Sequence, residues 1–160
     1  MAGLAAALWG QATAATQKLT EAQDAARANT AFQAHHYQAT AAIAKAMGAP
    51  LAALTDGSGS ALPANAAAAK LAAAGSGYKE VQPDEAQKLA DAGTLVIVAW
   101  ANPNGAGHLA TVRPGGVSGD AVHAGSRPPL INNVGVDVGI EGANWVFRKD
   151  ASVHYYTPSA

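Results

Sequence analysis

The sequence predicts an α+β domain in which N-terminal helices pack on a small, mostly antiparallel β-sheet. Apolar residues at helical spacing dominate the start of the chain. Residues that typically begin or end helices recur as far as Gly93, and short strand-like segments follow. Helices first and strands second are typical of an α+β domain with one sheet. A length of 160 residues suits one domain. We therefore expect residues 1–28 to form an amphipathic helix of the same domain as residues 29–160.

Apolar residues recur every three or four positions along the first 28 residues, which indicates one stripe of a long helix. The stripe comprises Leu4, Leu8, Ala12, Ala15, Leu19, Ala22 and Ala26. We expect this helix to pack on the domain, with a partner-binding helix as the alternative. The apolar start also vaguely resembles a signal peptide, but it lacks a basic region before a short apolar patch.

Three further helices are predicted. The first should run from about Thr30 to Met47, where Gly48 and Pro50 provide the stop. The turn-forming residues 55–63 then indicate a surface loop. A short alanine-rich helix should run from Asn65, as its N-cap, through Ala74. Residues 83–93 favour a compact helix, with Pro and acidic residues at its front and Gly behind it.

The chain changes character after Gly93. The predicted strands are Leu95–Trp100, His108–Val112, Ala121–Ala124 and Ser152–Tyr156, with Trp145–Arg148 as a possible fifth. The first two are joined by a polar turn, so that His108 stands at the start of a strand. Backbone pairing on both sides can hold such a histidine while its ring faces a cleft, as a general base requires.

Composition limits the possible functions. The net charge is −1, with 10 basic and 11 acidic residues. This charge argues against binding nucleic acid or an anionic membrane through electrostatics alone. No apolar run approaches the roughly 20 residues of a membrane helix, so we expect a soluble protein. The absence of cysteine excludes disulfides, thiolate metal sites and thiol catalysis. Alanine accounts for 42 residues, so large apolar side chains are few.

The strand half of the chain is similar to the papain-like cell-wall amidases, including the CHAP and NlpC types. The resemblance starts from residues 83–103 and the segment Gly107–Pro114, and it continues through Val122–Gly125, Asn132–Asn133 and Val153–Tyr156. It covers roughly residues 29–157. It implies a papain-like fold and hydrolysis of peptide bonds in peptidoglycan.

The nucleophilic cysteine sulfur on which that family's chemistry depends is missing from this chain. In these enzymes a cysteine opens the helix before the sheet, and the strand histidine takes its proton. Counting back from the helix end at Ile43–Gly48, the resemblance puts the nucleophile position near His36. Histidine does not replace a thiolate in acyl transfer, and Thr30 and Thr40 are the nearby hydroxyls. The expected protein is therefore amidase-like but inactive, or it uses different chemistry.

The resemblance also implies roles for other residues. His108 would be the general base, His123 its orienting group, and His36 with Tyr37 the mouth of the cleft. The turn 102–107 would border the cleft, and the candidate substrate-binding residues are Tyr37, Trp100, Asn102 and Asn104. His35 and His36 point about 100 degrees apart on a helix, so one of them is expected to be solvated. His154 is expected at the surface, and Trp100 and Trp145 are more often core residues.

Two alternative functions remain open. His36, His108 and His123 could hold a catalytic zinc ion if the papain-like layout applies, although no local metal motif is present. The chain could instead be a non-catalytic module that binds cell wall or a partner protein, because binding and chemistry are separable. An immunity or docking protein is a possible partner, and export without a classical signal is compatible with the sequence.

Overall fold

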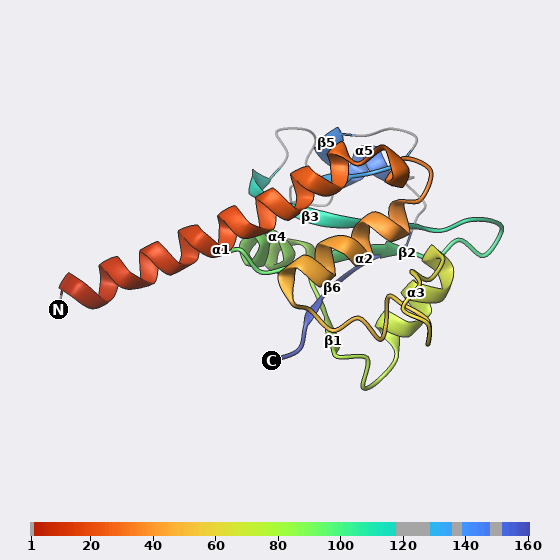
Figure 1. Ribbon diagram of the computed structural model, residues 1–160, viewed down its shortest axis with the longest axis horizontal. Coiled ribbons are helices and arrows are strands. Elements are labelled where there is room, and N and C mark those ends of the chain that lie inside the picture. The colour runs from red at the N-terminus through yellow and green to blue at the C-terminus, as the bar shows by residue number, and fades with distance from the viewer. Residues whose placement is uncertain (1, 118–128, 136–138, 148–151) are drawn as a thin grey trace.

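The computed structural model describes residues 2–117, 129–135, 139–147 and 152–160. Within these residues the chain is an α+β protein, as the sequence predicts (Figure 1). Six strands in the described part form one sheet in the order β1-β6-β2-β3-β4-β5, and every neighbouring pair is antiparallel. No helix in the described residues is both long and apolar enough to cross a membrane.

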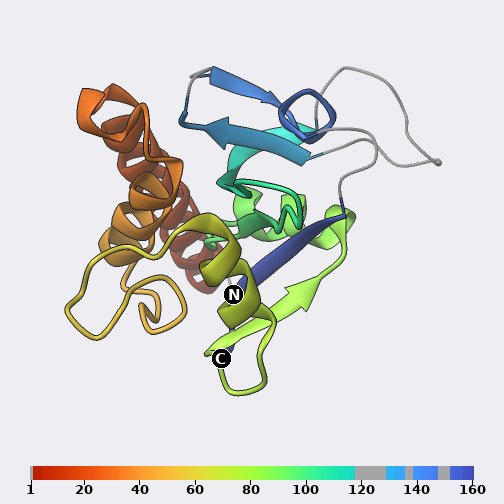
Figure 2. The same cartoon turned by 90° about the vertical axis from the view of Figure 1, so that its right-hand side faces the viewer.

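The helices are α1 (Ala2–Ala28), the 3₁₀ turn η1 (Thr30–Phe32), α2 (His36–Met47), α3 (Ala64–Ala72), α4 (Pro83–Asp91) and α5 (Ala143–Val146). The strands are β1 (Tyr78–Val81), β2 (Ile97–Trp100), β3 (His108–Val117), β4 (Pro129–Asn133), β5 (Gly139–Gly142) and β6 (Val153–Pro158). Helices α1, α2 and α3 lie on one side of the sheet (Figure 2). Helices α4 and α5 pack against the other face.

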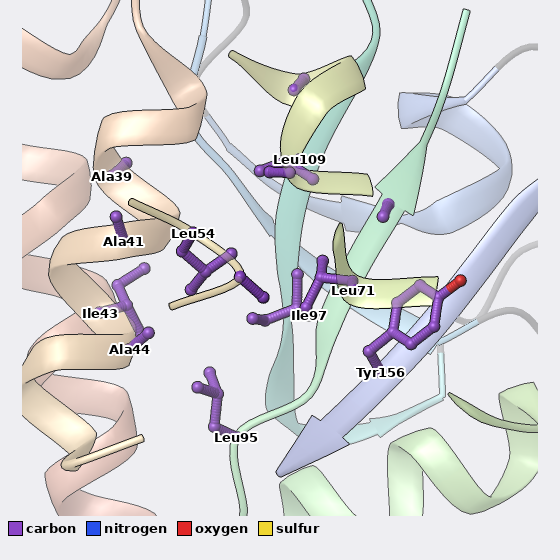
Figure 3. Packing of buried hydrophobic residues seen from close by; sticks show 14 of the residues in the cluster. Ala39, Ala41, Ile43, Ala44, Leu54, Leu71, Leu95, Ile97, Leu109 and Tyr156 are labelled. Carbon is purple, nitrogen blue, oxygen red and sulfur yellow. The ribbon is translucent and has the colours of Figure 1, made fainter. Parts of the chain in front are cut away.

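Residues 95–99 do not alternate between apolar and polar, because both faces of the sheet are covered by helices at strand β2. Ile97 and Ala99 pack with α2 and α3, while Val96 and Val98 pack with α4. A strand covered on both faces needs apolar residues at every position. Figure 3 shows Ile43 of α2 and Leu54 of the following loop facing Ile97 across this core.

The predicted long N-terminal helix is confirmed, and its second half is fixed to the sheet. Leu19 and Ala26 of the stripe are buried, as is Gln23 between them. The Gln23 amide donates to Thr111 Oγ1 at 2.9 Å and to the Val112 carbonyl at 2.8 Å. The first turns of α1 extend beyond the rest of the molecule (Figure 1).

The prediction of one helix from Thr30 to Met47 is wrong. The Asn29 side chain accepts the Ala31 backbone N–H at 3.0 Å and caps the short turn η1. His35 then leaves helical geometry, with φ −139° and ψ 60°, so that α2 begins at His36. Asn and other short polar side chains favour such local hydrogen bonds over helix continuation. The predicted stop is confirmed, because Gly48 ends α2 with φ +72°.

Other boundaries also need correction. Pro63, not Asn65, is the N-cap of α3, which ends at Ala72. Residues 143–146 form α5, so the possible strand Trp145–Arg148 is wrong where the structure describes it. Strand β3 continues past Val112 through a register shift that lies between Val112 and Val117. This stretch contains Pro114, and proline is accommodated in a sheet at such irregularities. The predicted strand Ala121–Ala124 lies outside the described residues.

Candidate functional site

Two histidines from distant parts of the chain lie together at the N-terminus of α2. The ring centroids of His36 and His108 are 4.2 Å apart, with 35° between the ring planes. His36 is the first residue of α2 and His108 the first residue of β3. The imidazole that follows Gly107 therefore lies against the helix tip that carries Tyr37.

His36 is held by the sheet through one ring nitrogen. The Leu109 backbone N–H donates to His36 Nδ1 at 3.2 Å. A backbone N–H can only donate, so the lone pair of Nδ1 is used and the proton of the neutral ring lies on Nε2. His36 therefore presents an N–H donor, and no lone pair, on its other side.

His108 has the complementary arrangement. Its Nε2 lies 2.8 Å from Oδ1 of Asn133, the last residue of β4. An amide oxygen accepts, so His108 Nε2 carries the proton and Nδ1 keeps a lone pair. The Phe147 ring contacts the His108 ring edge-on, with the ring centroids 5.6 Å apart. This is the neutral tautomer that a general base needs, with Asn133 as the group that fixes the ring.

Sequence reasoning did not assign a role to Asn133. The proposed orienting group, His123, lies outside the described residues. Asn133 is almost fully buried, and its position directly after the buried Ile131 and Asn132 was the available signal. A polar residue at the end of a buried strand must find a partner, and here the partner is His108.

The environment of both rings disfavours the imidazolium form. Burial, followed by the nearby His108 and His35, lowers the pKa of His36 from 6.5 to about 4. Burial also lowers the pKa of His108, against the opposing effect of the Asn133 hydrogen bond. The partial positive charge of the α2 N-terminus acts against a cation at His36 in the same direction. Both rings are neutral at pH 7.

This lowered pKa predicts acid-sensitive stability. Between pH 6.5 and about 4 the unfolded chain protonates His36 while the folded chain keeps it neutral. The stabilisation is therefore complete above pH 6.5 and is lost as the pH falls towards 4. We expect the Tm of His36→Gln to fall less than that of the wild type between pH 7 and pH 4.5. Parallel curves for the two proteins would contradict the burial of a neutral His36.

Gly107 and Asn65 fix the backbone at the point where strand β3 begins with His108. Gly107 is buried, and a Cβ at this position would overlap Asn65 Oδ1 and the Trp100 carbonyl oxygen. Asn65 of α3 accepts the Asn102 backbone N–H at 2.8 Å and donates to the carbonyls of Asn102 and Gly105 at 3.1 and 2.8 Å. Only glycine fits between the Asn65 side chain and the Trp100 carbonyl oxygen of β2. This explains the Gly-His sequence at the start of β3.

The other predicted site residues lie nearby with different exposure. Tyr37 contacts the rings of His35 and His36, each with centroids 5.7 Å apart, and its hydroxyl lies 3.2 Å from His35 Nδ1. Trp100 pairs with His108 across the β2–β3 ladder and packs partly into the core. The Asn102 side chain accepts the Asn104 N–H at 3.1 Å and donates to the Ala106 carbonyl at 3.2 Å. Asn102 therefore stabilises the turn, and Asn104 is exposed.

The position that the resemblance assigns to the nucleophile is occupied by His36, the first residue of α2. The chain contains no cysteine. The hydroxyl of Thr40 donates to the His36 carbonyl at 3.2 Å, within α2. Thr30 lies on η1, before the helix that carries His36. The arrangement therefore consists of two adjacent neutral imidazoles, one held by the Leu109 backbone N–H and the other by Asn133.

Of the three histidines in the zinc alternative, His36 and His108 are described and His123 lies outside the described residues. In the described residues no group of three or more His, Cys, Asp or Glu side chains could hold a metal ion. His36 would have to give up its hydrogen bond to the Leu109 N–H before either nitrogen could ligate. We therefore expect stoichiometric zinc to leave the Tm unchanged in a thermal melt. A rise in Tm that is lost in His36→Gln would restore the zinc hypothesis.

No protein-family model matches this chain, and no curated protein matches it in sequence.

Proposed function

We propose that this chain is a catalytically silent member of the papain-like cell-wall amidase superfamily, which binds peptidoglycan peptides without cleaving them. One observation carries the proposal. His36 stands at the start of α2, against His108, with Nδ1 occupied by the Leu109 N–H. In the layout implied by the resemblance, His36 fills the position of the nucleophile and His108 that of the base. Asn133 takes the orienting role that the resemblance gives to His123.

The tautomers explain why this site would bind but not react. Acyl transfer needs a nucleophilic lone pair, and His36 presents Nε2–H instead. Removing that proton would create an imidazolide, which His108 is far too weak a base to form. The pair instead offers one donor, His36 Nε2–H, and one acceptor, His108 Nδ1. A neutral peptide group, with one carbonyl and one N–H, is the complementary ligand.

Binding without product release is the test of this proposal. Wild-type protein incubated with insoluble peptidoglycan should sediment with it, while free amines in the supernatant stay at the level of the buffer control. His108→Ala should weaken binding about tenfold, the effect of roughly one hydrogen bond. Lys79→Ala changes an exposed side chain of β1 that belongs to neither histidine of the pair, and it is the control.

Two results would contradict the proposal. Amine release by the wild-type protein would make it an active hydrolase, in which His108 keeps the role of base. Failure of the folded wild-type protein to sediment would remove peptidoglycan as its ligand. Circular dichroism melts of each variant distinguish loss of binding from loss of fold.

A further inference from the structure

A second cluster of reactive groups lies on the other half of the sheet. His154 Nε2 is 3.1 Å from Ser152 Oγ, and His154 Nδ1 is 2.6 Å from Glu80 Oε1. Ser152 directly precedes β6, His154 is in β6, and Glu80 is in the neighbouring strand β1. None of these residues takes part in the His36–His108 site.

Strand geometry brings the three side chains together. Ser152 and His154 are two residues apart, so they point to the same side of the sheet. Glu80 is opposite Tyr156 in the antiparallel β1–β6 ladder, which makes His154 its diagonal neighbour. Long side chains reach one another across such a diagonal. The His154 ring also stacks on Tyr156, with centroids 6.4 Å apart and 27° between planes.

The hydrogen bonds favour one tautomer of His154. An ionised carboxylate can only accept, so the proton of His154 lies on Nδ1 and points to Glu80. Nε2 then keeps a lone pair that accepts the Ser152 hydroxyl proton. A hydroxyl hydrogen-bonded to a base, with that base oriented by a third group, is the arrangement of a nucleophilic serine.

We propose that Ser152, His154 and Glu80 form a second reactive centre that is acylated by small activated esters. Ser152 Oγ attacks the ester carbonyl carbon while His154 Nε2 takes the hydroxyl proton. The bond from carbonyl carbon to leaving oxygen then breaks, and His154 returns the proton to that oxygen. Water attacks the acyl-serine through the same base, which releases the carboxylic acid and restores the Ser152 hydroxyl.

The solvent exposure of the His154 and Glu80 side chains limits the class of substrate that this centre can attack. The side chains of His154 and Glu80 are 45% and 51% exposed. Water in the site weakens electrostatic stabilisation of a developing oxyanion, which is the largest contribution in efficient hydrolases. General-base assistance of about 10²–10⁴-fold remains. This suffices for esters with good leaving groups, such as phenyl esters, and falls short of peptide bonds.

The test is covalent labelling of the full chain with a fluorophosphonate probe, followed by mass spectrometry to locate the adduct. We expect Ser152 to be labelled at least a hundredfold faster than Ser58. Ser58 is an exposed serine whose hydroxyl contacts Asp56 and Ser60, with no imidazole. His154→Gln should abolish this difference. The acetyl group from p-nitrophenyl acetate should appear on Ser152 and be absent in Ser152→Ala.

Glu80 acts as a positioning residue and needs its own control. Glu80→Gln should slow labelling of Ser152 about tenfold or more, because the amide no longer selects the Nδ1–H tautomer. Glu80→Asp keeps the carboxylate and should recover part of the rate, whereas Lys79→Gln on the same strand should change nothing. Labelling of Ser152 no faster than Ser58, or unchanged labelling in His154→Gln, would overturn the proposal.

Discussion

On the proposed function, His36→Cys is expected to give the protein peptidoglycan hydrolase activity. The introduced thiol would stand at the first position of α2, beside a neutral His108 that Asn133 already orients. A helix N-terminus and an adjacent imidazole lower a thiol pKa below its usual value of about 8.5. Thiolate formation would therefore supply the nucleophile that the wild-type site lacks.

Two measurements check this expectation. Amine release from peptidoglycan should rise from background in His36→Cys and fall at least about a hundredfold in the double variant with His108→Ala. The rate of iodoacetamide alkylation against pH should give a lower thiol pKa than in Ser58→Cys, the exposed control. Because the chain has no native cysteine, each variant carries a single thiol.

The two measurements separate the possible failures. An ordinary thiol pKa in the folded variant would contradict the helix-tip geometry of the site. A lowered thiol pKa without amine release would uphold the geometry and count against peptidoglycan as the ligand. Release that persists in the double variant would remove His108 as the base.

Gly93→Ala is expected to cause the largest loss of stability from a single methyl group. Gly93 follows α4, has φ +84°, and is buried beneath α1. A Cβ at this position would overlap the backbone of Ala15 and Thr16. Left-handed backbone geometry costs alanine about 1–2 kcal/mol, and displacing a packed helix adds to this. We expect Gly93→Ala to lower the free energy of unfolding by about 3 kcal/mol in total.

Urea unfolding provides the measurement, and Gly48→Ala provides the matched control. Gly48 has φ +72°, and no atom lies within 4 Å of the Cβ that alanine would add. The loss of unfolding free energy in Gly48→Ala therefore reports only the left-handed backbone conformation, which costs alanine about 1 kcal/mol. Equal losses in the two variants would mean that α1 does not pack against Gly93 as described.

Several long or strongly patterned elements were readable from local sequence pattern. The spacing of Leu19, Ala22 and Ala26 predicted α1, and the apolar run to Trp100 predicted β2. Gly48 was correctly identified as a stop. Local signals failed where elements were short or irregular. The four-residue strands β1 and β5 were not predicted, and neither was β4. The turn at Asn29 that starts α2 at His36 was also missed.

The sequence by itself determined the α+β class, the lack of a thiol and the placement of His108 at a strand start, because these depend on composition and on residues close in the chain. Only the tertiary structure decided that His36 meets His108 and Leu109, that Asn133 holds the His108 ring, and that Asn65 clamps the 102–107 turn. The reason is physical: each of these contacts joins residues from separate elements, and their polar atoms find partners only when sheet and helices pack.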